Sequence, residues 1–138
     1  MSEILLQGHP GIGPEASGVA LVAADNFSAR YDLDLRTGVF SRPSHALFGE
    51  SYVGRVLVLN AAKGGVATAW MLHAMAAGGL VPAALLLNFA NPIMAQGAAF
   101  AGLPLIDRFA TDITAAIRSG DRLTVDPPEG RVTIERGA

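Results

Sequence analysis

Two runs of consecutive apolar residues, separated by a segment of helical length, place the strongest constraint on the fold of this chain. The first run lies within Arg55–Asn60 and the second within Ala83–Leu87. Runs that are apolar at every position are typical of strands buried on both faces of a sheet. Between them, Val66–Ala77 predicts a helix that ends at Gly78 and Gly79. Together they predict a β-α-β unit with parallel strands.

The segments on either side of this unit are rich in predicted strands. These strands are Ile4–Gln7, Ser17–Ala23, Arg30–Leu35, Leu103–Ile106, Leu123–Asp126 and Arg131–Glu135. Asn91 is expected to cap a second helix with Pro92 at its first position, and Asp112–Arg118 predicts a short third one. Gly8–Pro14 is too rich in glycine and proline for a regular element. The sequence therefore predicts a mixed α/β barrel or sandwich in a single domain over residues 1–138.

Composition narrows the possible functions. The 138 residues include no cysteine, 16% are charged, and the net charge is −2. This chain therefore holds no iron–sulfur cluster through thiolates of its own, and it offers no basic surface for nucleic acid. No apolar stretch is long enough for a membrane span and no signal peptide is evident, so we expect a cytoplasmic protein. The low charge content indicates either a large core or apolar surface that another subunit covers, and it makes a homo-oligomer of the isolated chain plausible.

The loop Lys63-Gly64-Gly65 is the strongest local candidate for a binding site. It lies between a predicted buried strand and a predicted helix. Glycines allow close approach of a ligand, the free N–H groups of a helix start favour anions, and the lysine adds a positive charge. This geometry suits a carboxylate or a phosphate. The alternative is a tight strand-to-helix turn with a solvated lysine.

Several single residues are weaker candidates. His45, in an irregular loop, is placed for acid–base chemistry or simply for ordering its own loop. Arg30 and Arg42 can bind a substrate carboxylate bidentately, although solvation of a charged strand face also explains Arg30. Trp70 and Phe48 are expected in the core or at an interface.

Three segments in register resemble the aconitase X swivel-domain family. His45, Leu47, Gly49 and Ser51 match its H-x-L-x-G-x-S segment, and Lys63-Gly64 matches its Lys/Arg-Gly loop. A third segment is matched by Asn91, Pro92, Ile93, Gly97, Ala98, Ala101, Leu103 and Pro104. The resemblance covers essentially the whole chain. It implies a swivelling β/β/α barrel like the mobile domain of aconitase.

The same resemblance implies a function. The chain would be the small subunit of a heteromeric hydro-lyase that dehydrates a small hydroxy-carboxylic acid, as family members do with phosphomevalonate or cis-3-hydroxyproline. An iron centre is expected in a large partner subunit, with no cofactor held by this chain. Lys63, Gly64, Gly65, His45, Ser51 and Arg30 are the expected substrate-binding residues.

One departure from the family pattern affects the chemistry. Family members have a serine after the Lys/Arg-Gly pair, and by analogy with aconitase it acts as the catalytic base. Gly65 occupies that position here, and a glycine cannot take a proton. Thr68, one helical turn further on, is the nearest hydroxyl and the candidate replacement. The alternative is a non-catalytic structural, regulatory or anion-binding module that has lost the catalytic serine.

Overall fold

The computed structural model describes residues 2–62 and 65–136, with only the backbone described for Ser2, Ala29, Arg30 and Thr68. The strands are β1 (Ser2–Gln7), β2 (Ala16–Val22), β3 (Leu33–Asp34), β4 (Val39–Phe40), β5 (Val56–Ala62), β6 (Ala84–Ala90), β7 (Leu105–Ile106), β8 (Arg122–Asp126) and β9 (Arg131–Arg136). The helices are α1 (Ala29–Asp32), α2 (Val66–Gly78), α3 (Pro92–Ala101), α4 (Ile113–Ala116) and the 3-10 turn η1 (Pro127–Glu129). None of the helices in the described ranges is long and apolar enough to cross a membrane.

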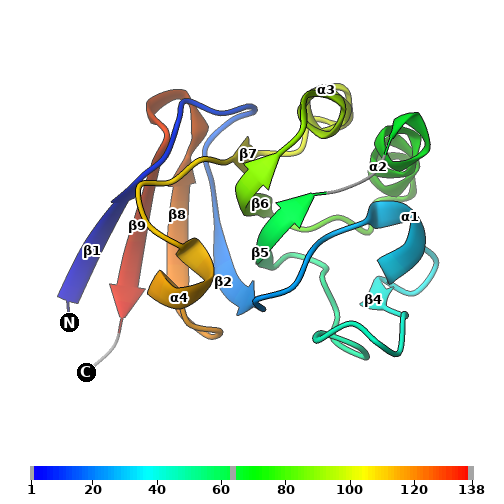
Figure 1. Cartoon of the computed structure of the whole chain (residues 1–138), viewed down its shortest axis with the longest axis horizontal. Coiled ribbons are helices and arrows are strands. Elements are labelled where there is room, and N and C mark those ends of the chain that lie inside the picture. Colours follow the sequence, from blue (N-terminus) through cyan, green and yellow to red (C-terminus); the bar gives the residue numbers. More distant parts are fainter. Residues whose placement is uncertain (1, 63–64, 137–138) are drawn as a thin grey trace.

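One seven-stranded sheet, in the order β1-β9-β8-β2-β5-β6-β7, forms the body of the molecule. Its left-hand side in Figure 1 is the antiparallel set β1, β9 and β8, and α2 and α3 lie on the opposite side of the molecule. Strand β2 joins the two halves, because Ala16–Val19 pairs antiparallel with β8 and Ala20–Val22 pairs parallel with β5. Strands β5, β6 and β7 continue the parallel half, as the β-α-β pattern predicts.

The parallel strands are buried on both faces, which explains their continuous apolar runs. Leu57 and Leu85 face a cluster that includes Leu72 and Met75 of α2. Val58 faces a second cluster formed with the antiparallel strands and α4. Burying an aliphatic side chain contributes about 1.5–3 kcal/mol. Both clusters therefore stabilise the parallel strands at the centre of the fold.

The glycine-rich loop after β1 closes the sheet into a barrel. Ile12 exchanges two backbone hydrogen bonds with Leu105 of β7, with N···O distances of 2.8 and 2.9 Å. A Cβ atom at Gly11 would lie 2.0 Å from the carbonyl oxygen of Leu105, so only glycine permits this approach. The mixed α/β barrel that we predict from the sequence is confirmed.

The predicted strand Arg30–Leu35 is wrong in its first half. Its residues 30–32 belong to the short helix α1, and only Leu33–Asp34 form a strand, paired with β4. The alternating pattern places Asp32 on an exposed face, but its side chain is only 1% exposed. Its carboxylate accepts a hydrogen bond from the Ser28 amide at 2.8 Å, and its amide donates to the Ser28 carbonyl at 2.9 Å. These bonds close a helical turn that side-chain periodicity does not reveal.

Candidate active site at the carboxyl ends of the parallel strands

Polar side chains meet at the carboxyl ends of β2, β5 and β6. Asn60 donates from Nδ2 to Asn26 Oδ1 at 3.2 Å, and Asn88 donates from Nδ2 to Asn60 Oδ1 at 3.0 Å. Asn88 Nδ2 also donates to Asp112 Oδ1 at 2.8 Å. These four residues, here called the asparagine ladder, follow the end of the sheet from β2 to the start of α4. In parallel α/β sheets, ligands bind outside this end of the strands.

The direction of every amide in the asparagine ladder is determined by the backbone. The Ile113 N–H donates to Asn88 Oδ1 at 3.0 Å, so Asn88 Nδ2 must point to Asn60 and Asp112. Asn60 then presents its oxygen to Asn88 and its amino group to Asn26. Hydrogen bonds from Asn88 and Thr114 hold the pKa of Asp112 below its ordinary value. Its ionised carboxylate can only accept hydrogen bonds, and it forms one end of the asparagine ladder. The amino group of Asn26 is left at the other end.

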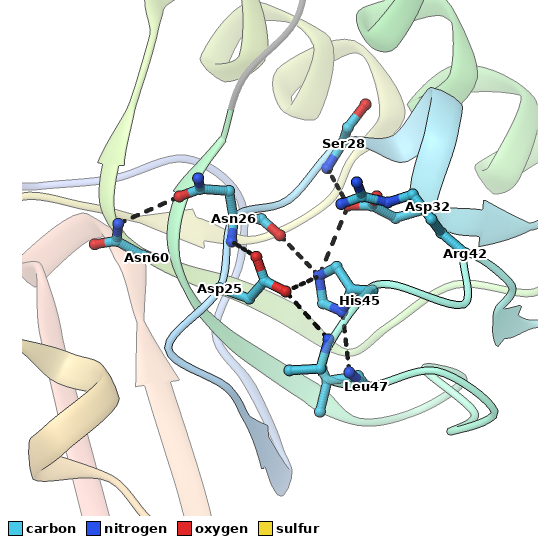
Figure 2. Close-up of polar contacts among 9 residues, drawn as sticks. Asp25, Asn26, Ser28, Asp32, Arg42, His45, Leu47 and Asn60 are labelled. Atoms are coloured by element: carbon cyan, nitrogen blue, oxygen red, sulfur yellow. Dashed lines mark hydrogen bonds and ion pairs between the residues drawn. The ribbon is translucent and has the colours of Figure 1, made fainter.

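His45 connects two loop segments beside the asparagine ladder through hydrogen bonds of its ring. Its ring is 3% exposed and stacks on Phe40, with the ring centroids 4.8 Å apart. Nδ1 accepts a hydrogen bond from the Leu47 amide at 3.0 Å, and Nε2 lies 2.8 Å from the carbonyl oxygen of Asn26 (Figure 2). An accepting Nδ1 carries no proton, so the ring is the neutral Nε2–H tautomer and donates to Asn26. The geometry therefore supports loop ordering, and contact of His45 with a substrate stays a prediction.

Two carboxylates and one guanidinium surround His45. Asp32 Oδ1 lies 2.6 Å from Arg42 Nε, and Asp25 Oδ2 and Asp32 Oδ2 lie 3.8 and 3.7 Å from His45 Nε2. Asp32 Oδ1 has no aligned hydrogen bond among the described residues, so its contact with Arg42 is electrostatic rather than directional. Asp25 accepts from the Ala46 amide at 3.1 Å, and this bond, more than any other contact, holds the pKa of Asp25 below its ordinary value.

An open pocket of about 550 Å³ lies against these groups. It is lined by Asp25, Asn26, Phe27, Ser28, Tyr31, Asp32 and Arg42. The Phe27 amide donates to the Ala61 carbonyl at 2.9 Å, and Phe27 bridges to Ala62. The pocket therefore lies beside the end of β5, where the predicted binding loop begins.

The predicted binding loop is only partly within the described residues. Lys63 and Gly64 lie outside them. Gly65 is the residue before α2, with a φ of −110°, and it is exposed. A Cβ atom at Gly65 would meet no atom of the described residues within 4 Å, and φ lies outside the left-handed region, so neither these neighbours nor backbone strain requires glycine here.

The other predicted residues lie in several different elements. The backbone of Thr68 is in the first turn of α2 and that of Arg30 is in α1, and both side chains lie outside the described part. Ser51 Oγ accepts from the Val53 amide at 3.3 Å within a turn, and no contact joins it to the asparagine ladder in the described ranges. Trp70 and Phe48 are 66% and 55% exposed, so they are not core residues. Their expected role at an interface stays a prediction.

The asparagine ladder is absent from our sequence predictions although the sequence carries a signal for it. Asn60 and Asn88 each interrupt an otherwise apolar strand, in V-L-V-L-N-A-A and A-L-L-L-N-F-A. Because the carboxyl ends of parallel strands meet at one end of a sheet, two such asparagines are expected close together. Asn26 and Asp112 have no comparable signal, because they lie in loops.

The described side chains do not form a site for a resident metal. Among residues 2–62 and 65–136 no group of three histidine, aspartate or glutamate side chains is close enough to hold an ion. The whole sequence contains no cysteine. A four-ligand iron or zinc site needs more donors than this arrangement supplies.

Comparison with known proteins gives one consistent result. The family model described as the aconitase X swivel domain matches residues 5–134. The phosphomevalonate dehydratase small subunit of Methanocella arvoryzae is 33% identical over 94% of this chain and 98% of its own length. The corresponding protein of Pyrococcus horikoshii is 33% identical over 90% of this chain and 91% of its own length.

Solved structures agree with the sequence comparisons. A chain in the crystal structure of Thermococcus kodakaraensis aconitase X, in its holo-form, superposes with a TM-score of 0.89 at 25% identity. The superposition covers 96% of this chain and 99% of that one. A solution NMR structure of a UPF0107 protein has a TM-score of 0.87 at 28% identity, covering 96% and 100% of the two chains.

Proposed function

The chain belongs to the aconitase X swivel-domain family, and we propose that it acts as the small subunit of a heteromeric hydro-lyase that removes water from a small hydroxy-carboxylic acid. The observation that carries this proposal is the alignment with dehydratase small subunits over almost the full length of both chains. The geometry supports it, because the polar end of the sheet forms an open pocket rather than an enclosed active site. Such a site is completed by a second chain, and the relatives' designation as small subunits implies a large subunit as that partner.

In this proposal the small subunit binds and orients the substrate. Lys63 with the amides of Gly64 and Gly65 holds a carboxylate or a developing negative charge at the end of β5. Arg30 and Ser51 contribute further polar contacts, and His45 keeps the adjoining loops in place through its bonds to Asn26 and Leu47. Thr68 is the candidate base within this chain, and the large subunit is the other possible source of one.

Iron belongs to the large subunit in this proposal. The aconitase X resemblance implies an iron centre, but the described side chains of this subunit supply no ligand set for it. No step of the reaction is therefore assigned to a metal held by this chain. Its residues act on the organic substrate, and a cytoplasmic location and self-association of the isolated chain remain predictions.

The competing function is a non-catalytic module, and Gly65 favours it. Without the family serine, the chain would bind an anion or support a partner while doing no chemistry. Co-expression with a large aconitase X-type chain encoded beside it separates the two possibilities. A stable complex that contains iron and removes water from one member of a panel of hydroxy acids supports the hydro-lyase. A small chain that stays alone and metal-free beside a folded large chain supports the module.

A further inference from the structure

Helices α2 and α3 form an outer layer that contains no charged residue. Lysine, arginine, aspartate and glutamate are all missing from the two helices, whose sequences are VATAWMLHAMAAG and PIMAQGAAFA. A helix at the surface ordinarily carries charged and polar side chains on the face turned away from the core. Here Trp70 and Phe100 are 66% and 75% exposed on such faces. The layer therefore has the composition of buried helices, although part of it lies open to solvent.

The outward faces of the two helices lie on one side of the molecule. Leu72 of α2 and Met94 of α3 pack into the same core cluster, so the opposite faces of both helices point away from that cluster. The helices touch at Ala69 and Gly97, where a Cβ atom on Gly97 would lie 2.8 Å from Ala69. Figure 1 shows α2 and α3 next to each other at the upper right.

On α2, the exposed apolar residues lie on the solvent side of the contact with α3. At about 100° per residue, Val66 and Trp70 lie roughly 60° and 100° to one side of Ala69. The buried Leu72 lies about 60° to the other side. The ring of His73 meets that of Trp70 edge-on, with the centroids 6.0 Å apart, and this contact helps to orient the indole.

On α3, the same relation holds in the opposite rotational sense. Ile93 and Phe100 lie about 40° and 60° to one side of Gly97, and the buried Met94 lies about 60° to the other side. Since the two helices face each other, opposite senses place both exposed stripes on the solvent side of their contact. They form one apolar surface, here called the α2–α3 face, whose large side chains are Val66, Trp70, Ile93 and Phe100.

We infer that the α2–α3 face is the surface on which the large subunit docks. This inference rests on the proposed function, because it names the part of this chain that the proposed partner covers. The central parts of protein interfaces are depleted of charged residues and enriched in tryptophan and phenylalanine, and the interfaces of permanent complexes are the most apolar. The α2–α3 face has both properties.

Area and position favour the large subunit over a second copy of this chain. The exposed parts of the four large side chains amount to on the order of 400 Å². A standard interface buries about 800 Å² per partner, so a two-fold contact through this face alone is too small for a stable dimer. Val66 directly follows Gly65 of the predicted binding loop. A chain that completes the site at the end of β5 therefore reaches the start of α2 and can cover both surfaces.

Trp70 supplies a direct reporter for the test, because it is the single tryptophan of the sequence. The chain is labelled with fluorotryptophan and mixed with the unlabelled large aconitase X-type chain encoded beside it. In the complex, the fluorine NMR signal should shift and become protected from a soluble gadolinium chelate. A stable complex in which the signal keeps its position and its accessibility would overturn the inference.

Two charge substitutions test the surface independently of the label. Trp70→Lys and Phe100→Lys are each expected to weaken binding of the large chain at least about thirtyfold, and to leave the unfolding midpoint of the isolated chain unchanged. Leu5→Lys is the matched control, because Leu5 is 63% exposed on β1, in the antiparallel half away from the helices (Figure 1). This control should bind as the parent chain does. Parent-like binding of both helix variants would overturn the inference.

The remaining outcomes separate the inference from the proposed function. A dimer of the isolated chain that protects Trp70, and that the large chain cannot displace, would overturn the assignment to the large subunit. A complex that forms through the α2–α3 face but removes no water from any hydroxy acid would contradict the proposed function and support the docking surface. A folded large chain that never binds would overturn both.

Discussion

Replacing Gly65 by serine tests whether a hydroxyl at this position can act as the catalytic base, as the serine of other family members is expected to do. The φ of Gly65 is −110°, outside the left-handed region, and a Cβ atom would meet no atom of residues 2–62 and 65–136 within 4 Å. Serine and glycine differ by only a few tenths of a kcal/mol at the start of a helix. Gly65→Ser is therefore expected to change the free energy of unfolding by less than about 0.5 kcal/mol.

The expected effect on turnover is much larger. A positioned general base contributes about 10²–10⁴-fold to rate, which corresponds to about 3–5 kcal/mol of the activation barrier. If the complex lacks only this hydroxyl, Gly65→Ser raises the rate of water loss by a factor that approaches about 10²–10⁴. The assay follows formation of the carbon–carbon double bond by absorbance, with the complex of both subunits and a saturating hydroxy acid. Urea unfolding of the variant alone measures its stability.

Gly65→Ala is the matched control, because it adds the same Cβ atom without a hydroxyl. Equal turnover of the serine and alanine variants would refute the reasoning, and the base would then be Thr68 or a residue of the large subunit. A loss of more than about 1 kcal/mol of stability in Gly65→Ser would refute the conclusion that the position has room for a side chain.

Three further results are expected. Lys63→Ala should abolish turnover of the complex while leaving the thermal unfolding midpoint of the chain unchanged, and unchanged turnover would remove the loop from the mechanism. Gly97→Ala should lower the free energy of unfolding by about 1–3 kcal/mol in urea titrations, because a Cβ atom there would lie 2.8 Å from the backbone of α2. Gly78→Ala is the control and should not lower it, because a Cβ atom there would meet no described atom within 4 Å. Hydrogen bonds from Arg136 hold the pKa of Asp121 below its ordinary value of 3.8. The stability that Asp121 contributes is therefore present above pH 3.8 and is lost as the pH falls through the lower pKa of the folded state. Asp121→Asn should remove this pH-dependent part of the stability, measured as urea midpoints at decreasing pH.

Local sequence signals were sufficient for most of the elements. Asn91 caps α3 as predicted, accepting from the Met94 amide at 2.8 Å, and Gly79 and Gly102 end α2 and α3 in the left-handed conformation. The hairpin of β8 and β9 also forms as predicted, with Leu123 opposite Ile134. Each of these features depends on contacts between residues close in the chain, and such contacts are encoded in short patterns.

One prediction was wrong and one was incomplete, because hydrogen bonds that periodicity does not encode decided the outcome. Alternating charges predicted a strand through Asp32, but Asp32 is buried against Arg42 and its turn is helical. The glycine-rich loop was predicted as a loop, without its role of pairing Ile12 with Leu105 to close the barrel. The turn at Asp32 is closed by side-chain and backbone bonds to Ser28, which an alternating pattern does not reveal. Leu105 lies too far along the sequence from Ile12 for a local pattern to identify the pairing.

The sequence by itself determined the parallel unit, the limits of α2 and α3 and the family, because apolar runs, caps and motifs are properties of neighbouring residues. Only the tertiary structure decided what the polar residues do. It joined Asn26, Asn60 and Asn88 into one hydrogen-bonded line and used both nitrogens of His45 within the protein. The physical reason is that a side-chain hydrogen bond requires an alignment within a few tenths of an ångström. The register and twist of the assembled sheet set that alignment, and spacing along the chain does not.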